Sequence, residues 1–239
     1  MSPLKVHIEE SLSPKIVDLL SPHFDIEQSY ENCVTGLVQK GEELFYRSET
    51  RGDIKFDFNE LWSSHQNKSY SINKEPLAKA LGIKGRSKTH VWDLTCGSGK
   101  DSILLLKFGA KVTAFERNPS VAALLILAKS KFRSDSLDIK CAMATEYNEL
   151  LLSDPPDVMY YDPMYPDEGK KKSSLPRKEM QVFRELVGKD LDEEDIFNWV
   201  KKSGVKRFVV KRGVKSPTLK AKPSSQYIGK SARYDLYIF

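Results

Sequence analysis

The chain has 239 residues, of which 40% are apolar and 30% are charged, and its formal net charge is +5. This length suits one large α/β domain, with or without a small extension. The longest fully apolar run, residues 121–128, is too short to span a bilayer, and the first ten residues lack the apolar stretch of a signal peptide. Three widely spaced cysteines, Cys33, Cys96 and Cys141, indicate neither a disulfide framework nor a zinc site. We therefore expect a cytoplasmic protein with no structural metal and no membrane segment.

The positive charge is concentrated at one end of the chain. Residues 196–239 hold 11 Lys and Arg against one acidic residue, a net charge of +10, whereas residues 1–195 hold 27 basic and 32 acidic residues, a net charge of −5. Concentrated positive charge is typical of proteins that bind polyanions. A solvated lysine-rich surface would give the same count, so charge alone leaves nucleic-acid binding open.

The predicted elements change character near residue 85. Residues 34–49 and 52–59 predict a small antiparallel β unit because their apolar residues alternate, and residues 74–85 predict a helix that ends at a glycine. From residue 88 onward, strands and helices alternate, which indicates βαβ units. The predicted strands are 90–94, 111–116, 137–142, 157–162, 206–212 and 232–239, and the predicted helices are 100–109, 118–135, 146–153, 177–188 and 192–204.

This order predicts an α/β fold. We expect a mostly parallel sheet with helices on both faces and an antiparallel last strand, because the final strand follows a short connection. A small N-terminal α+β region of residues 1–85 would precede a main domain of residues 86–239.

The first strand of the main domain ends in the glycine-rich turn "DLTCGSGKD". Asp93 closes the strand, and Gly97 and Gly99 would let the backbone approach a ligand closely. Glu116, at the tip of the next strand, is placed to accept hydrogen bonds from ribose hydroxyls. Asp101 would repel a pyrophosphate at the helix start, whereas S-adenosylmethionine has no phosphate and carries a cationic sulfonium and amino group. The pattern is typical of a class I, Rossmann-like methyltransferase; a dehydrogenase, or a glycine turn with surface acids, are the alternatives.

The fourth strand ends in "DPMYP", beside that turn in the predicted sheet. The segment is similar to the (D/N)-P-P-(Y/F) motif of methyltransferases that act on exocyclic or amide nitrogens, with Met164 replacing the second proline. The Asp162 carboxylate and the Pro163 carbonyl would accept hydrogen bonds from the amine, and Tyr165 would stack on a base. Alignment of nitrogen, methyl carbon and sulfur would supply much of the catalysis. A proline-bounded strand end with a core tyrosine is the structural alternative.

Together with "ERNPSVAALL", "RFVVKR" and "RYDLY", these motifs resemble the RsmJ family of 16S ribosomal RNA guanine-N2 methyltransferases, over about residues 35–239. The resemblance implies methyl transfer from S-adenosylmethionine to the exocyclic N2 of a guanine in the 3′-terminal hairpin loop of small-subunit rRNA. It implies cofactor contacts at Lys100, Asp101, Glu116, Arg117 and Asp162 and, after the third strand, at Ala144 and Thr145, where the relatives have a serine pair.

The partner expected from this resemblance is 16S rRNA, either naked, in the 30S subunit or in an assembly intermediate, and the protein is expected to be a monomer. The target base must be unpaired or flipped to reach a strand-tip pocket. The charged loop of residues 166–176 is predicted to close over the substrate. Phosphate contacts, which give affinity without sequence choice, are expected at Lys170, Lys171, Lys172, Arg177, Lys178, Lys211 and Arg212.

Two other functions stay open at this point. One is a different amino-group methyltransferase, acting on adenine in DNA or RNA or on a protein glutamine. The other is a non-catalytic RNA-binding assembly factor with a vestigial cofactor fold. The acids Asp93, Glu116 and Asp162 argue against the second, because a vestigial site has no physical need for all three.

Overall fold

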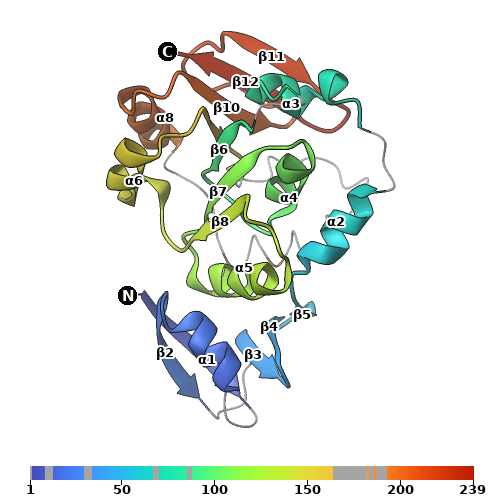
Figure 1. Cartoon of the computed structure of the whole chain (residues 1–239), viewed down its shortest axis with the longest axis vertical. Helices are drawn as coiled ribbons and strands as arrows, with labels where there is room; N and C mark the ends of the chain where they lie inside the picture. Colours follow the sequence, from blue (N-terminus) through green and yellow to red (C-terminus); the bar gives the residue numbers. More distant parts are fainter. Residues whose placement is uncertain are drawn as a thin grey trace.

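The computed structural model describes residues 2–8, 13–29, 34–66, 70–84, 88–163, 182, 186 and 193–239. Within these residues the chain forms a seven-stranded sheet and a five-stranded sheet, with α5 (Pro119–Lys131) between them (Figure 1). No helix of the described part is long and apolar enough to cross a membrane. The described side chains also contain no cluster of His, Cys, Asp and Glu that could hold a metal ion.

The seven-stranded sheet has the order β11-β12-β10-β9-β6-β7-β8. Its strands are β6 (His90–Asp93), β7 (Lys111–Phe115), β8 (Leu137–Lys140), β9 (Val158–Tyr161), β10 (Arg207–Arg212), β11 (Ser225–Ile228) and β12 (Arg233–Ile238). Strands β6 to β10 are parallel, and β12 is antiparallel to both its neighbours, as predicted. The chain moves outward from β6 to β8 and then returns to β9 on the other side of β6. This reversal creates a switch point between β6 and β9, where α/β sheets bind ligands.

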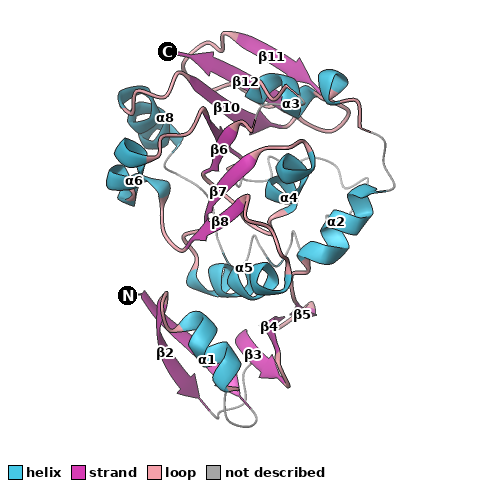
Figure 2. Cartoon of the chain, in the orientation of Figure 1, coloured by secondary structure: helices cyan, strands magenta, loops and turns pink. Residues whose placement is uncertain are grey.

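Helices cover both faces of this sheet, which confirms the predicted architecture (Figure 2). On one face lie α3 (Pro76–Leu81), α4 (Lys100–Lys107) and α5, and on the other lie α6 (Asn148–Ser153) and α8 (Glu193–Lys202). Successive strand residues point to opposite faces. Accordingly Val91 and Tyr160 pack with the α4 side, whereas Trp92 and Met159 pack with the α8 side.

The five-stranded sheet has the order β2-β1-β3-β4-β5. Its elements are β1 (Ser2–Ile8), α1 (Pro14–Leu20), β2 (Phe24–Ser29), β3 (Gly36–Lys40), β4 (Glu43–Ser48) and β5 (Gly52–Ile54). The antiparallel pairing of β3, β4 and β5 agrees with the predicted β unit. The parallel strands β1 and β2 were not predicted.

The predicted strand of residues 52–59 was wrong in its second half. Strand β5 ends at Ile54, and α2 (Phe58–Gln66) begins four residues later. The Asp57 carboxylate accepts hydrogen bonds from the backbone N–H groups of Asn59 and Glu60, at 2.9 and 3.0 Å. An aspartate that caps the first free N–H groups in this way starts a helix despite the alternating pattern around it.

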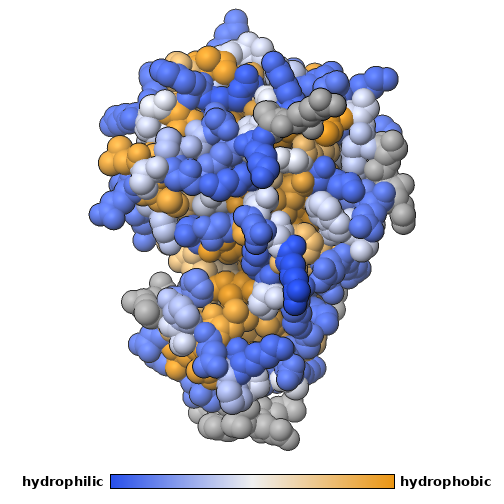
Figure 3. Space-filling view, in the orientation of Figure 1, coloured by the Kyte–Doolittle hydropathy of each residue, from blue (hydrophilic) through white to orange (hydrophobic). Residues whose placement is uncertain are grey.

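The longest apolar run of the sequence lies in α5, and all of residues 121–128 are buried. Val121, Leu125 and Ala128 pack into the large sheet, whereas Leu124 and Leu127 pack with the small sheet. A helix that is apolar all round is stable only when it is covered all round. Apolar surface is visible where the two parts of the molecule meet (Figure 3).

Helices α2 and α3 pack with the large sheet, although both belong to the predicted N-terminal region. Helix α2 contacts α4, and α3 contacts β10, β11 and β12. The boundary near residue 85 stays a prediction, and this packing favours an earlier one, near residue 55.

Candidate active site

The two glycines of the turn between β6 and α4 have different surroundings. Gly97 and Gly99 have φ angles of 55° and 77°, in the left-handed region that favours glycine. A Cβ atom on Gly99 would lie 2.6 Å from Cε1 of Phe58, whereas one on Gly97 would have no atom within 4 Å. Gly99 is therefore needed for close packing against α2, and Gly97 faces open space where a ligand can approach.

Glu116 follows β7, and its carboxylate is held by main-chain groups. Its Oε2 atom accepts a hydrogen bond from Gly97 N at 3.1 Å, and its Oε1 atom accepts one from Asn118 N at 2.8 Å. Each carboxylate oxygen can accept more than one hydrogen bond. Glu116 is thus fixed beside the glycine turn with acceptor capacity left for ribose hydroxyls, so these residues suit S-adenosylmethionine.

Asp93 lies beneath the turn, with 1% of its surface exposed. It accepts hydrogen bonds from Ser102 Oγ at 2.5 Å and from Thr95 N at 3.3 Å. Burial raises the pKa of this carboxyl to about 7. Asp93 was predicted to contact the cofactor directly; its burial instead favours a supporting role for the turn and the start of α4.

The tip of β9 lies directly beside the cofactor turn, as predicted. Asp162 N donates a hydrogen bond to Thr95 Oγ1 at 2.8 Å, and Leu94 N donates one to Tyr160 O, also at 2.8 Å. The Asp162 side chain is partly exposed and Pro163 is buried. Tyr165 and the predicted closing loop lie outside the described residues.

Three charged side chains, joined by one tyrosine hydroxyl, meet at this tip. The Lys211 ammonium lies 2.8 Å from Asp101 Oδ2 and 2.8 Å from Asp162 Oδ2. The Tyr160 hydroxyl donates a hydrogen bond to Asp101 Oδ2 at 2.6 Å. Burial opposes charge on Asp101, but the Lys211 ammonium and the Tyr160 hydroxyl outweigh it and lower the pKa of this carboxyl. Burial also opposes charge on Lys211, yet the two carboxylates raise the pKa of the ammonium above its ordinary value.

The predicted RNA contacts have three different outcomes. Lys211 was expected to meet phosphate and instead engages Asp101 and Asp162. Arg212 is buried, with its guanidinium 2.9 Å from the Glu193 carboxylate, so its predicted place on an RNA-facing surface was wrong. The other five lie outside the described residues: Lys170, Lys171, Lys172, Arg177 and Lys178.

The two residues predicted to contact the cofactor after the third strand differ in exposure. Ala144 is 3% exposed and belongs to the core beneath α6 and α8. Thr145 is partly exposed, in a single 3-10 turn. Cys141 directly follows β8, and burial together with the nearby Glu116 carboxylate raises its pKa to about 12. Cys141 therefore lies within electrostatic reach of the Glu116 carboxylate. The contacts at Ala144 and Thr145 stay a prediction.

Two further residues predicted to contact the cofactor lie at the edge of the site. Lys100 is the first residue of α4 and is partly exposed, and Arg117 is exposed directly after Glu116. The sequence reasoning missed Thr95 and Tyr160. Thr95 lies inside the recognised turn motif, and Tyr160 shares a strand face with Asp162 by the two-residue alternation of β9, so both could have been found.

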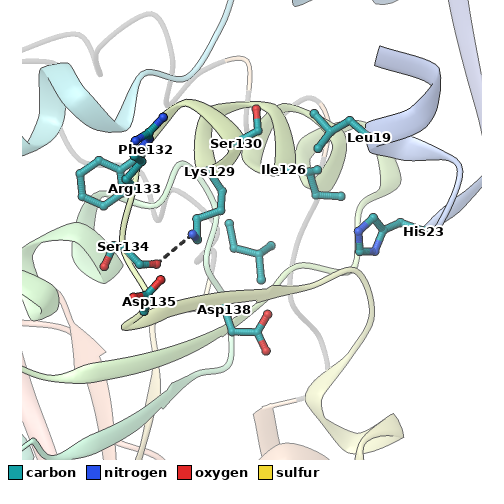
Figure 4. A pocket seen from close by; sticks show the side chains of 11 residues that line it. Leu19, His23, Ile126, Lys129, Ser130, Phe132, Arg133, Ser134, Asp135 and Asp138 are labelled. Carbon is teal, nitrogen blue, oxygen red and sulfur yellow. Dashed lines mark hydrogen bonds between the residues drawn. The ribbon is translucent and has the colours of Figure 1, made fainter. Parts of the chain in front are cut away.

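A groove of about 640 Å³ lies elsewhere, between α1 and the turn that joins α5 to β8 (Figure 4). Its side chains carry both charge signs, among them Lys129, Arg133, Asp135 and Asp138. The Lys129 ammonium donates a hydrogen bond to Ser134 O at 2.9 Å. Because β8 starts at this side, the groove lies at the amino edge of the sheet, away from Glu116 and Asp162.

Comparison with known proteins agrees with this geometry. The family model described as "Putative SAM-dependent methyltransferase" matches residues 20–239. Ribosomal RNA small subunit methyltransferase J of Colwellia psychrerythraea is 39% identical over 194 residues, which cover 78% of this chain and 71% of that protein. The enzyme of the same name from Pseudomonas paraeruginosa is 36% identical, with 84% and 81% covered.

A solved structure shows that the likeness extends to the whole fold. The crystal structure of an SAM-dependent methyltransferase from Neisseria gonorrhoeae is 26% identical, with a TM-score of 0.75 over 98% of this chain and 95% of that one. The glycine turn, the acid after β7 and the Asp-Pro tip after β9 thus occur in a chain that matches the family model over residues 20–239 and the solved structure over 98% of its length. The chain belongs to the ribosomal RNA small subunit methyltransferase J family, a family of S-adenosylmethionine-dependent methyltransferases.

Proposed function

We propose that this protein methylates the exocyclic N2 of a guanine in the 3′-terminal hairpin loop of 16S rRNA. The single observation that carries the proposal is the place of Asp162 and Pro163, whose backbone is bonded to the cofactor turn through Thr95. A substrate amine held at this tip lies next to the expected methyl donor. The names of the curated relatives support the class of RNA, and the resemblance of the motifs supports the guanine N2.

The residues of the tip suit an amine that is a poor nucleophile. When bound, S-adenosylmethionine supplies an electrophilic methyl group on a sulfonium sulfur. The Asp162 carboxylate and the Pro163 carbonyl accept the amine hydrogens and orient the nitrogen lone pair toward that methyl group. After methylation the nitrogen is acidic, and its proton can pass to the Asp162 carboxylate or to water. Lys211 is unsuited to take this proton because its raised pKa keeps it charged.

Exposed lysines at the carboxyl edge of the sheet suit phosphate contacts. Lys215 follows β10, and Lys230 lies in the turn between β11 and β12; both are exposed. Neighbouring strands lie about 4.8 Å apart, so these two positions are within a few strand widths of Asp162. Lys201 and Lys202, at the end of α8, lie at the amino edge and serve as controls.

The test is a methyl-transfer assay with radiolabelled S-adenosylmethionine. The substrates are 30S subunits from cells that lack the modification, beside wild-type subunits and protein-free 16S rRNA, and the products are separated as nucleosides. Label as N2-methylguanosine in the unmodified subunits alone, and its loss in Asp162→Ala, is the expected result. The protein-free rRNA reports whether assembled subunits are required.

Other outcomes point to the alternatives. Label in N6-methyladenosine or in protein would keep the fold and cofactor and overturn the guanine assignment. Tight cofactor binding without label in any substrate would contradict these substrates, and absence of both would favour an RNA-binding assembly factor. An rRNA substrate implies a cytoplasmic reaction, and we expect the protein to act as a monomer, which light scattering can check.

A further inference from the structure

Lys211 occupies a position that the sequence alone assigned to RNA. It is the fifth residue of β10, and the register of β10 with β9 pairs Val209 with Tyr160 and Val210 with Tyr161. One residue further, Lys211 stands beside Asp162. Alternation along both strands then turns the side chains of Tyr160, Asp162 and Lys211 to the face that carries α4.

We propose that Lys211 is a positioning residue that joins the cofactor-side carboxylate of Asp101 to the substrate-side carboxylate of Asp162. Its ammonium lies 2.8 Å from an oxygen of each, and about three quarters of its side-chain surface is covered (25% exposed). This inference deepens the proposed function and rests on it for the role of Asp162. It replaces the expected contact between Lys211 and an RNA phosphate.

Two contacts from different elements hold Asp162 in place. Lys211 engages Oδ2, and Thr95 Oγ1 accepts from the Asp162 backbone N–H. Asp162 is thereby held through its backbone and through one carboxylate oxygen, beside the expected place of the substrate amine. A carboxylate fixed before the substrate arrives loses little freedom during the reaction, which is the advantage of a preorganised site.

The charged and titratable groups around Lys211 come from five elements. They are Asp101 on α4, Tyr160 and Asp162 at the end of β9, Tyr234 on β12, Asp93 at the end of β6 and His65 on α2. Tyr234 is the residue paired with Lys211 across the β10–β12 ladder. Burial keeps both tyrosines neutral by raising their pKa values, that of Tyr234 to about 12. Within this group, the Lys211 ammonium forms ion pairs with both carboxylates.

The test compares Lys211→Met with Lys211→Arg. Loss of the cation leaves two neighbouring carboxylates that favour protonation, so the acidic limb of the pH–rate profile should move to higher pH in Lys211→Met. The kcat at pH 7 should fall by about 10- to 100-fold, in the range of an electrostatic contact in a site, with the KM for 30S subunits changed less than about twofold. Lys211→Arg keeps the charge and should restore the position of the acidic limb.

Two control variants separate this role from RNA binding. Lys215→Met should raise the KM for RNA and weaken its salt dependence without moving the acidic limb, because an exposed phosphate contact acts through counterion release. Lys202→Met, at the amino edge, should behave as wild type. If Lys211→Met instead follows the pattern of Lys215→Met, the RNA assignment is right and the present inference is overturned.

A second readout needs neither RNA nor turnover. The affinity for S-adenosylmethionine, measured by calorimetry from pH 5 to 8, should fall toward the acidic end of this range. In Lys211→Met this acidic limb should lie at higher pH than in wild type or in Lys211→Arg. An unshifted limb overturns the inference even if the enzyme methylates guanine. A shifted limb without guanine methylation by the wild type supports it and rejects the proposed function.

Folding failure of one variant does not end the test. If Lys211→Met is unfolded, the double variant Asp162→Asn/Lys211→Met removes a carboxylate together with the cation and should be folded. In that case its acidic limb is compared with that of Asp162→Asn alone. If the acidic limbs of these two variants lie at the same pH, the inference is overturned. The titration of Asp101 would then not depend on Lys211.

Discussion

The two halves of the site hold their carboxylates in different ways. On the cofactor side, Glu116 is held by two backbone N–H groups and Asp93 by a hydroxyl and a backbone N–H. On the substrate side, the Asp162 carboxylate is held by the Lys211 ammonium, which also contacts the cofactor-side carboxylate of Asp101. Main-chain donors come with the fold, whereas the ammonium depends on a single side chain.

Because of this difference, the two halves should be sensitive to different substitutions. A backbone amide keeps its dipole whatever the side chains are, so the cofactor half should respond mainly to changes in the turn itself. The substrate half should respond to loss of one charge, since an unpaired carboxylate in a partly buried site is costly. Substitutions can therefore separate binding of the cofactor from catalysis.

The largest expected effect is that of Asp162→Asn. The amide keeps the size of the side chain but removes the charge that stabilises the developing cation on the substrate nitrogen. The kcat should fall by about 100-fold or more, as when one preorganised contact is removed. The affinity for S-adenosylmethionine, measured by calorimetry, should change little because Asp101 keeps its partner Lys211.

A control for this prediction is Asp138→Asn, on the exposed side of β8 near Lys140. It should keep wild-type kcat. A loss of cofactor affinity in Asp162→Asn as large as its loss of kcat would show that the two halves are not separable.

The next effect is on stability and uses the two glycines of the turn. Gly99→Ala adds a methyl group 2.6 Å from the Phe58 ring at a φ of 77°, whereas Gly97→Ala meets only the strain of its own backbone. We expect a loss of about 2–4 kcal/mol in the free energy of unfolding for Gly99→Ala and about 1 kcal/mol for Gly97→Ala. Urea unfolding without cofactor measures both; equal losses would mean that Phe58 moves aside freely.

Glu116→Gln should have a smaller effect, on the cofactor alone. One of the two backbone N–H groups that meet the carboxylate would face the amide NH2 group instead, and the charge near the ribose is lost. The affinity for S-adenosylmethionine should fall about 10-fold, as expected for one charge-assisted hydrogen bond. The kcat at saturating cofactor should stay close to wild type, and a kcat loss like that of Asp162→Asn would contradict the division of the site.

The smallest effect is the pH dependence that comes from Asp93. Its pKa is raised from 3.8 to about 7 by burial, so the folded state binds this proton more tightly than the unfolded state. The contribution of Asp93 to stability therefore declines as the pH rises through the window from about 4 to about 7. Urea unfolding at pH 5, 6 and 7 should show a weaker decline, or a steeper rise, in Asp93→Asn than in wild type. Parallel curves for the two proteins would mean that Asp93 is ionised throughout.

Local signals in the sequence were sufficient for much of the main domain. Asn118 and Pro119 predicted the start of α5, and the side chain of Asn118 accepts hydrogen bonds from Ser120 N and Val121 N. The parallel order of β6 to β9 and the antiparallel β12 follow from alternation and connection length. Strand β11 was missed because its serine- and lysine-rich surroundings carry no apolar pattern, and three of its four residues are exposed.

What the sequence determined by itself is the chemistry that short segments encode: the glycine turn, the acid at the tip of β7 and the Asp-Pro tip of β9. Each depends on residues close together in the chain. Only the tertiary structure decided the role of charges far apart in sequence. Lys211 is 49 residues from Asp162 and 110 from Asp101, and its partners follow from the register of β10 with β9. Arg212 is a second example, because it is buried against Glu193. A lysine or arginine in the sequence shows its charge, and only the packing of strands and helices shows what that charge faces.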